Sequence, residues 1–533
     1  MEWFDICDEN GIPTGKTVSR EQAHREGILH RTAHVWVIRK ENGRYQILLQ
    51  KRSEIKDSFP GLYDTSSAGH IPAGCEPPAS AVRELQEELG ITAEESELHY
   101  TGRFRIKYEK VFHGKLFRDN EISDVYVYDR PVDTAGLVLQ ESEVSEVRWF
   151  DLQEVCEQLD LRPDLFCIPK GGLEALTAYL ASPEALVREA FEEGLFNGTW
   201  LYAENGEIVS KGAVGFRDAQ DRLPMREDST FELASITKQF TAAAVMQLVR
   251  AGKLSLEDEV TKYYPGLPYP GVTIRHLLTH TGGIPETYDD DNWIMKRYRE
   301  EKKVAGSDVV IRFLMESGEK PRFAPGEKYE YTNGGYNLLA EIVAKVSGVP
   351  FESYLRENIF EPAGMYRTGV CHIQTEEIPH DNFVRNMVLK DGAYVPVADS
   401  DDRDVAAFDG LNGDDYVYSD IFDLFRWDRA LREEKLLTRE EQQQMYTPGK
   451  LNDGSNAGAN EKNDGYGFGW GIRNDPGLGL IVMHSGGMPG LNTWFERFVD
   501  ADRVLVLLNC REPRDRQAYE EFFERMRGIA RRL

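Results

Sequence analysis

Short alternating segments in the first third of the chain predict a β-rich domain. Residues 35–38 and 45–49 combine β-branched, aromatic and aliphatic side chains, and Glu41-Asn42-Gly43 between them is typical of a turn. Residues 124–128 alternate in the same way, and residues 146–150 are typical of a last strand. We therefore expect strands and a hairpin in this part of the chain.

Longer apolar patterns predict helices. Residues 152–159 and 172–180 have helical character, and residues 239–249 form an apolar run without Gly or Pro. A further helix is expected between Pro77 and Gly90, because Pro fits a first turn and Gly fits the position after the last one. Its apolar stripe consists of Val82, Leu85 and Leu89. Its acidic face consists of Glu84, Glu87 and Glu88.

Size and charge limit the classes of function. A chain of 533 residues is too long for one hydrophobic core, so two domains are expected, residues 1–181 and 184–533. The net charge of −28 argues against binding to nucleic acid or to an anionic membrane surface. The N-terminus has no secretory pattern, no stretch can span a bilayer, and the six cysteines are scattered. We expect a cytoplasmic protein that acts on small molecules. The sequence does not indicate its oligomeric state.

The acidic helix and the loop before it resemble the Nudix box of diphosphate hydrolases. The matching positions are Gly69, Arg83, Glu84, Glu87, Glu88 and Gly90. The resemblance implies an α/β/α sandwich whose helix carboxylates hold Mg²⁺ or Mn²⁺ beside a diphosphate, since such cations prefer carboxylate oxygens. Cys75 occupies the position of a Glu that in the family supports the loop through the box Arg, and Glu76 is expected to substitute in part. A solvated acidic face is the alternative for this helix.

Flanking segments are similar to the Nudix branch near isopentenyl-diphosphate isomerase. They are residues 3–6, 29–31, 48–52 and 59–64. Ala68 stands where the isomerases carry a catalytic Cys, so isomerisation is not expected. The resemblance places a second metal or base site near His24, His30, His70, Asp119 and Glu121. The match at His24 is displaced by one residue, which makes it the least expected member of this set. A structural role for each of these histidines is the alternative.

Ser235-Ile-Thr-Lys238 opens the apolar run at residues 239–249. Residues three apart share a helix face, so the hydroxyl and the amine can form an activated Ser-Lys pair. The alternative to a catalytic role is a structural one, because Ser is also a common helix N-cap.

Two later segments, Tyr331-Thr332-Asn333 and His484-Ser485-Gly486-Gly487, follow in an order that resembles the serine β-lactamase and penicillin-binding-protein superfamily, above all class C enzymes and their esterase and peptidase relatives. The resemblance runs from about Ala185 to the C-terminus. It implies an antiparallel sheet flanked by helices, a helical subdomain holding Tyr331, and no cofactor.

The same resemblance assigns roles around the nucleophile. Ser235 attacks an acyl carbon, Lys238 and Tyr331 act together as base, and Asn333 holds Lys238 or the substrate amide. The oxyanion lies between the backbone N–H of Ser235 and that of Gly487, which is expected on an edge strand. The alternatives are a packed aromatic for Tyr331 and a turn residue for Asn333.

His484 occupies a position where β-lactamases carry a Lys that receives the substrate carboxylate. A histidine is mostly uncharged at neutral pH unless a neighbour shifts it. We therefore expect an esterase, an amidase or a D-amino-acid peptidase rather than an efficient β-lactamase. Three alternatives remain: a Nudix half that only binds ligand, a scaffold or sensor without catalysis, and two halves that act on one molecule.

Overall fold

The computed structural model describes residues 2–56, 58–112, 114–220, 222–289, 293–372, 382–400 and 406–532. The chain divides into two compact units, Met1–Ala185 and Leu186–Leu533. The division lies inside helix α5 (Pro183–Glu192), close to the predicted limits at residues 181 and 184. Each unit is described by itself.

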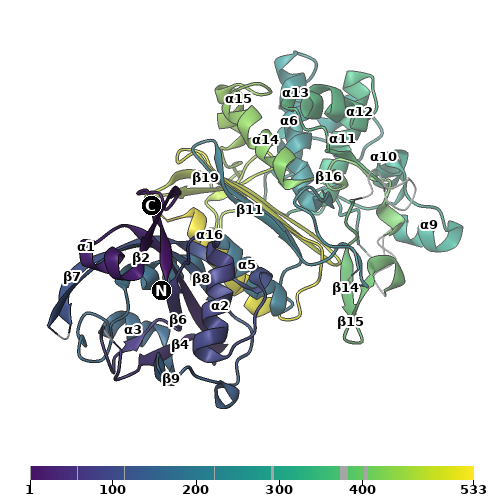
Figure 1. Ribbon diagram of the computed structural model, residues 1–533. Coiled ribbons are helices and arrows are strands. Elements are labelled where there is room, and N and C mark those ends of the chain that lie inside the picture. Colours follow the sequence, from purple (N-terminus) through teal and green to yellow (C-terminus); the bar gives the residue numbers. More distant parts are fainter. Residues whose placement is uncertain are drawn as a thin grey trace. The chain divides into compact units, whose positions relative to one another are not determined.

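The first unit is built on one mixed sheet (Figure 1). Its strand order is β5-β4-β3-β8-β7, with β6 paired to β3 and β9 paired to β4. β3 and β8 run parallel, and the other neighbours are antiparallel. The strands of this unit, including the separate β1-β2 ribbon, are β1 (Trp3–Cys7), β2 (Pro13–Ser19), β3 (His30–Glu41), β4 (Arg44–Arg52), β5 (Tyr63–Asp64), β6 (Ser67–His70), β7 (His99–Phe112), β8 (Lys115–Tyr128) and β9 (Val144–Asp151).

Helices cover both faces of this sheet, which makes the unit the expected α/β/α sandwich. One core joins Ala81, Leu85 and Leu89 of α2 (Pro77–Leu89) to one face of the sheet. The other core joins α3 (Leu152–Gln158) and α4 (Lys170–Leu180) to the opposite face. The predicted strands and helices of this half are confirmed, and Gly90 ends α2 in the left-handed region at φ 72°.

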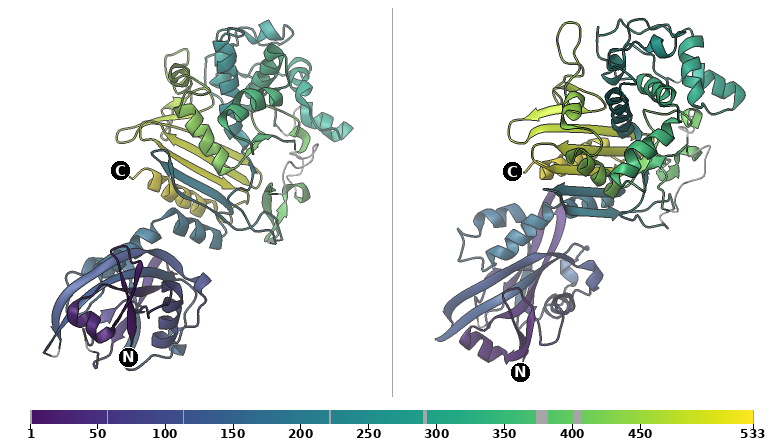
Figure 2. Two further views of the ribbon diagram at one scale, coloured as in Figure 1. Left: turned by 45° about the horizontal axis from the view of Figure 1, so that its top comes forward. Right: turned by 90° about the horizontal axis from the view of Figure 1, so that it is seen from above.

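The second unit is built on an antiparallel sheet with helices on both faces (Figure 2). Its strand order is β11-β10-β21-β20-β19-β18-β17. Helix α5 and the C-terminal helix α16 (Arg516–Ala530) pack on one face, and the larger core with the other helices lies on the opposite face. The strands are β10 (Gly198–Glu204), β11 (Glu207–Val214), β17 (Gly465–Tyr466), β18 (Gly471–Asp475), β19 (Gly479–Met488), β20 (Leu491–Phe498) and β21 (Arg503–Asn509). This is the fold class expected from the sequence.

Helices and short strands complete the second unit. The helices are α6 (Thr237–Arg250), α7 (Val260–Tyr263), α8 (Ile274–Leu278), α9 (Trp293–Glu301), α10 (Ser307–Glu316), α11 (Asn333–Ser347), α12 (Phe351–Leu355), α13 (Glu361–Ala363), α14 (Ile421–Arg432) and α15 (Arg439–Met445). The short strands are β12 (Phe231–Glu232), β13 (Gly369–Val370), β14 (Met387–Lys390), β15 (Ala393–Pro396) and β16 (Val417–Ser419). Strand β16 pairs with both β12 and β13, so segments far apart in sequence meet there.

One expectation about the sheet needs correction. Gly487 was expected on an edge strand, but β19 lies inside the sheet between β18 and β20. The ladder to β18 spans Gly479 to Met483, whereas the ladder to β20 continues to Met488. The half of β19 that carries His484 and Gly487 is therefore paired on one side only, because β18 is short.

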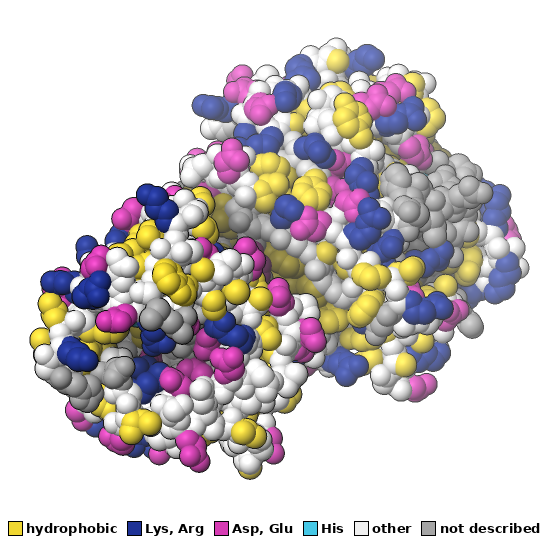
Figure 3. Space-filling view, viewed as in Figure 1, with side chains coloured by type: hydrophobic (Ala, Val, Ile, Leu, Met, Phe, Trp, Pro, Cys, Tyr) yellow, Lys and Arg dark blue, Asp and Glu magenta, His cyan; other side chains and the backbone are white. Residues whose placement is uncertain are grey.

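The described surface carries charges of both signs. On the face shown in Figure 3, acidic and basic side chains of the described residues are interspersed. Within the described ranges no helix is both long and apolar enough to cross a bilayer.

Candidate functional sites

Ser235 lies in a short 3₁₀ turn, Ala234–Ile236, that leads from β12 into α6. Ala234 has φ 48°, in the left-handed region that side-chain-bearing residues rarely adopt. Such backbone strain is found where a fold holds a residue in a required position. The N-cap of α6 is Ile236, without a side-chain capping bond, so Ser235 does not serve as its cap.

Lys238 is fully buried and lies against Ser235. Its Nζ is 3.0 Å from Ser235 Oγ, 2.7 Å from Asn333 Oδ1 and 3.2 Å from the Asp414 carbonyl oxygen. Burial lowers the pKa of Lys238, while nearby carboxylates, Asp415 first, oppose that shift. The structure thus joins Ser235, Lys238 and Asn333 in one hydrogen-bonded group.

Tyr331 and Asn333 reach this group from the start of α11. Asn333 is the first residue of the helix, and its N–H donates to Glu286 Oε2 at 2.9 Å. Lys238 Nζ lies 5.0 Å from the centroid of the Tyr331 ring, close enough for a cation–π contact. Burial raises the pKa of the Tyr331 phenol well above its usual value, although a hydrogen bond with Ser235 lowers it. All four predicted residues therefore meet at one place.

His484 contributes no positive charge to this site. Its Nε2 is 2.9 Å from Tyr466 Oη and its Nδ1 is 2.6 Å from the Ser485 carbonyl oxygen. Because that carbonyl accepts only, Nδ1 carries the proton and Nε2 accepts from the Tyr466 hydroxyl. Burial, followed by the charge of Lys238, lowers the pKa of His484 to about 3. The ring is neutral at physiological pH.

Two glycines of β19 differ in what they allow. A Cβ on Gly486 would collide with the Leu233 carbonyl oxygen and with Thr493 Oγ1, so only glycine lets β19 approach the Ser235 turn this closely. Gly487 faces open space. The close approach brings the end of β19, which carries the predicted oxyanion donor, beside the 3₁₀ turn that carries Ser235.

Sequence reasoning missed two buried carboxylates beside Ser235. Ser235 Oγ donates to Asp415 Oδ1 at 3.3 Å, and Asp415 is 5 % exposed. Asp414 is fully buried and accepts a hydrogen bond from Asn337 Nδ2. An acidic pair between polar and aromatic residues gives no sequence signal of burial, and the pairing of β16 with β12 brings this segment close to Ser235.

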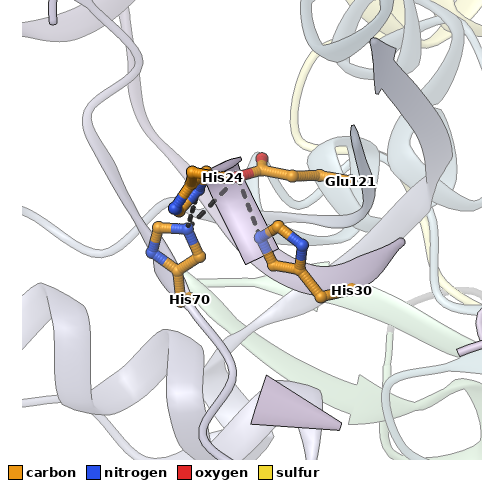
Figure 4. A group of neighbouring side chains, drawn as sticks. All are labelled: His24, His30, His70 and Glu121. Carbon is orange, nitrogen blue, oxygen red and sulfur yellow. Dashed lines mark hydrogen bonds and ion pairs between the residues drawn. The ribbon is translucent and has the colours of Figure 1, made fainter. Parts of the chain in front are cut away.

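The first unit holds a cluster of possible metal ligands (Figure 4). His24, His30, His70 and Glu121 each present a ligand atom, and these atoms lie within 4.8 Å of one another. Glu121 Oε1 is 3.3 Å from His70 Nε2 and 3.5 Å from His30 Nε2. The less expected His24 belongs to the cluster, with its Nε2 3.3 Å from His70 Nε2. Asp119 lies beside it, 3.8 Å from His24 Nε2.

Backbone carbonyls orient two of these rings. His24 Nδ1 is 3.0 Å from the Arg20 carbonyl oxygen, and His30 Nδ1 is 2.8 Å from that of Ile28. The carbonyls fix the proton on Nδ1, which leaves both Nε2 lone pairs directed into the cluster, as in metal sites. His30 Nε2 and Asp119 Oδ1 are buried without a hydrogen-bond partner. This excess of buried acceptors fits a cation.

The three helix carboxylates stand on α2 with different surroundings. Glu88 is buried and accepts from Ala68 N at 3.1 Å and from Gln50 Nε2 at 3.3 Å. Glu84 lies against Gly69, where any Cβ would collide with its carboxylate, and Glu87 is exposed. Burial raises the pKa of Glu84 and of Glu88.

One cavity of about 720 Å³ connects the two ligand groups of the first unit. It is lined by Glu84, Glu87 and Glu88 and by His24, His70, Asp119 and Glu121. Basic side chains also line it, namely Arg20, Arg52 and Lys56, each of which is paired with a carboxylate. Its volume is in the range of small-molecule sites.

Family comparisons identify both halves. The family model described as Beta-lactamase matches residues 184–523, and the model described as NUDIX domain matches residues 28–166. The chain belongs to the Beta-lactamase family. It also carries a Nudix hydrolase domain, and both domains belong to hydrolase families.

Individual relatives match the two halves separately. Penicillin-binding protein 4* of Bacillus subtilis is 36 % identical over 324 residues, 60 % of this chain and 69 % of that protein. Esterase EstB of Burkholderia gladioli is 27 % identical over 352 residues, which cover 60 % of this chain and 87 % of that esterase. An uncharacterized Nudix hydrolase of Clostridium acetobutylicum is 37 % identical over 163 residues, 31 % of this chain and 76 % of that protein.

The loop of the Nudix domain is not supported in the way expected at Cys75. Within the described ranges, Arg83 pairs with Glu84 and Glu87 and donates to the His70 carbonyl oxygen at 3.1 Å, but makes no ion pair with Glu76. Arg31 instead donates to the Cys75 carbonyl oxygen at 3.1 Å, and Asp5 accepts from Gly74 N at 2.8 Å. Arg31 and Asp5, outside the box, thus hold the loop together with Arg83.

Proposed function

We propose that the β-lactamase-like half hydrolyses an ester or an amide through Ser235. The observation that carries this proposal is the position of Lys238 Nζ, 3.0 Å from Ser235 Oγ and 2.7 Å from Asn333 Oδ1. A serine hydroxyl needs a base within hydrogen-bond reach, and Lys238 and Tyr331 are the two candidates from the sequence motifs. The oxyanion would lie between the N–H groups of Ser235 and Gly487.

The proposed substrates are esters, amides and D-amino-acid peptides rather than β-lactam antibiotics. A neutral His484 cannot attract a substrate carboxylate as a lysine at that place would. The likeness to an esterase supports ester substrates.

The test is hydrolysis of a short-chain nitrophenyl ester by the full chain and by Ser235→Ala. Activity should disappear in the variant, while the fold measured by circular dichroism stays unchanged. The matched control is Ser255→Ala, which removes an exposed loop hydroxyl bonded to Glu257 N. Equal activity of Ser235→Ala and the parent would reject the proposal and favour a scaffold or sensor role.

For the Nudix half we propose cleavage of a diphosphate-containing small molecule with Mg²⁺ or Mn²⁺. Glu84, Glu87 and Glu88 would hold one cation, and Glu121 with His24, His30 and His70 would hold a second, with Asp119 beside them. A bound divalent cation supplies Lewis-acid stabilisation of the charge on a diphosphate. Arg20, Arg52 and Lys56 place positive charge around the same cavity.

Hydrolysis is favoured over isomerisation because Ala68, beside Gly69 and His70, offers only a methyl group to the cavity.

The test of the Nudix half is phosphate release from a panel of diphosphates with Mg²⁺, comparing Glu87→Gln with Glu76→Gln. Both side chains are exposed, but only Glu87 lines the cavity. A loss confined to Glu87→Gln is expected. No release by the parent chain, together with binding of a diphosphate, would favour a Nudix half that only binds ligand.

A further inference from the structure

The backbone on both sides of Tyr331 is tethered to one residue, His280. The Glu330 N–H donates to the His280 carbonyl oxygen at 3.0 Å, and the Thr332 N–H donates to His280 Nδ1 at 3.3 Å. The segment that carries Tyr331 is irregular and precedes α11, so these bonds satisfy N–H groups that a helix or a sheet would otherwise pair. His280 therefore holds Tyr331 in place through both of its neighbours in the chain.

The His280 ring also lies against the Tyr331 ring. Their centroids are 4.2 Å apart and the ring planes are inclined by 35°, whereas the His280 ring lies farther from Tyr466, at 4.7 Å, and from Tyr336, at 5.1 Å. Tyr331 is 37 % exposed, so contacts on its buried side decide where its phenol lies. A hydrogen bond joins that phenol to Ser235. The ring of His280 thus supports a side chain that reaches the hydroxyl of the proposed nucleophile.

The backbone of His280 is strained. Its φ is 55°, in the left-handed region that residues with a side chain seldom adopt. His280 follows α8, and its own N–H donates to the Leu277 carbonyl oxygen at 3.3 Å. In this conformation the carbonyl group and the ring of one residue both reach residues 330–332. Strained conformations of this kind persist where the surrounding fold holds a residue for a function.

The imidazole of His280 is neutral, and its tautomer is fixed. Because the Thr332 N–H donates to Nδ1, the ring proton lies on Nε2. Burial, followed by the charge of Lys238, lowers the pKa of His280 well below its usual value. Within the described residues, the buried Nε2 has no hydrogen-bond partner, so packing alone does not explain an imidazole at this position. The acceptor that Nδ1 offers to Thr332 does explain it.

We propose, on the basis of the proposed acyl hydrolysis, that His280 is the positioning residue for Tyr331. Its ring and its two backbone tethers hold the phenol where it can act together with Lys238 on the proton of Ser235. In this role His280 takes no proton and does not contact the substrate. Misplacement of a reacting group by about 1 Å can slow a reaction about 100-fold, so loss of this support should affect the chemical step more than substrate binding.

The first test is His280→Asn in the full chain. Asparagine tolerates a positive φ, and its side-chain oxygen can accept from the Thr332 N–H, so the variant removes mainly the ring contact with Tyr331. The readout is the nitrophenolate burst, which reports acylation. We expect the acylation rate to fall roughly 10–100-fold while KM stays within threefold. The matched control is His276→Asn, expected within twofold of the parent, because His276 Nδ1 likewise accepts from a backbone N–H, that of Thr273 at 3.1 Å.

A double-mutant cycle distinguishes positioning of Tyr331 from a general structural role. Tyr331→Phe keeps the aromatic ring and removes the phenol hydroxyl. If His280 acts through that hydroxyl, His280→Asn should change the residual acylation rate of the Tyr331→Phe chain by less than threefold, because residues that act through one another are not additive. A larger loss in that background would show general damage to the site and would overturn the inference.

Three further outcomes would also count against His280 as a positioning residue. They are a His280→Asn acylation rate within tenfold of the parent, a loss confined to KM, and a Tyr331→Phe chain that acylates as fast as the parent. If His280→Asn does not fold, His280→Phe, which keeps a ring but removes the acceptor for Thr332, enters the same cycle with the same expected result. A parent activity that does not need Ser235 would reject the proposed function itself, whereas activity that needs Ser235 but not His280 removes only this inference.

Discussion

The two sites differ in how their buried polar groups are satisfied. In the β-lactamase-like half, the Lys238 amine makes three hydrogen bonds, all to groups of the same chain. In the Nudix half, buried acceptors converge on one another, and His30 Nε2 and Asp119 Oδ1 have no hydrogen-bond donor. The hydrogen bonds of the first site are made within the chain, while the second presents buried acceptors that a cation would satisfy.

Removal of metal should separate the two activities most strongly. Treatment with EDTA should lower diphosphate hydrolysis by about 10³-fold or more, because water activation and charge neutralisation are lost. Ester hydrolysis by the same sample should stay within twofold. Both rates are measured on one preparation, and readdition of Mg²⁺ or Mn²⁺ should restore the first. A parallel loss of both activities would break the comparison.

A change in the histidine cluster should give the next largest effect. His70→Gln should weaken Mn²⁺ binding by roughly 10–100-fold, as the removal of residues around a bound metal does. The Mn²⁺ affinity is measured by calorimetry. His99→Gln is the matched control, since His99 lies 3.6 Å from Asp129 and pairs with Val127, at the end of β7 opposite the part that pairs with Asp119 and Glu121. Unaltered Mn²⁺ affinity in His70→Gln would assign these rings a structural role.

The variant Gly486→Ala tests whether close backbone contact, rather than a metal ion, positions the residues of the serine site. Gly486→Ala should cost about 1–3 kcal/mol in the free energy of unfolding, because its Cβ meets the Leu233 carbonyl oxygen. The acylation rate should fall roughly tenfold or more, since displacement of β19 misplaces the oxyanion donor. Gly528→Ala, at an open position of α16 that lies outside the predicted site residues, is the control for both thermal unfolding and rate. Equal behaviour of the two variants would contradict this account.

The smallest expected effect concerns pH. With its pKa at about 3, His484 stays neutral between pH 5 and 8. Over this pH range, the preference of the enzyme for a neutral ester over a carboxylate-bearing ester should therefore change by no more than about twofold. A His484 of ordinary pKa would favour the anionic ester increasingly as pH falls below about 6.5. The ratio of kcat/KM for the two esters across this range is the measurement. His484→Lys should shift the ratio toward the anionic ester at every pH.

The sequence predicted elements and motif residues better than the contacts between distant segments. Sequence patterns located α2, α6 and four strands of the first unit, β3, β4, β8 and β9, and motif order placed Ser235, Lys238, Tyr331 and Asn333 in one half. Asp415 was missed because it lies 180 residues from Ser235 in the sequence, and the pairing of β16 with β12 that brings the two segments together leaves no sequence signal. The edge position of Gly487 was misjudged because the length of β18 decides it. His24 was the least expected ligand, since its place depends on how α1 (Arg20–Glu26) packs on β8.

The pairing of β12 with β16 has a consequence for how this protein responds to heat. Only two residue pairs, Phe231 with Ser419 and Glu232 with Tyr418, form the ladder that joins the nucleophile's turn to the strand after Asp415. Such short ladders open locally at lower free energy than the large sheet. On warming, acyl turnover should therefore fade reversibly while the bulk secondary structure is still intact, so that inactivation would report a local opening rather than the melting of the domain.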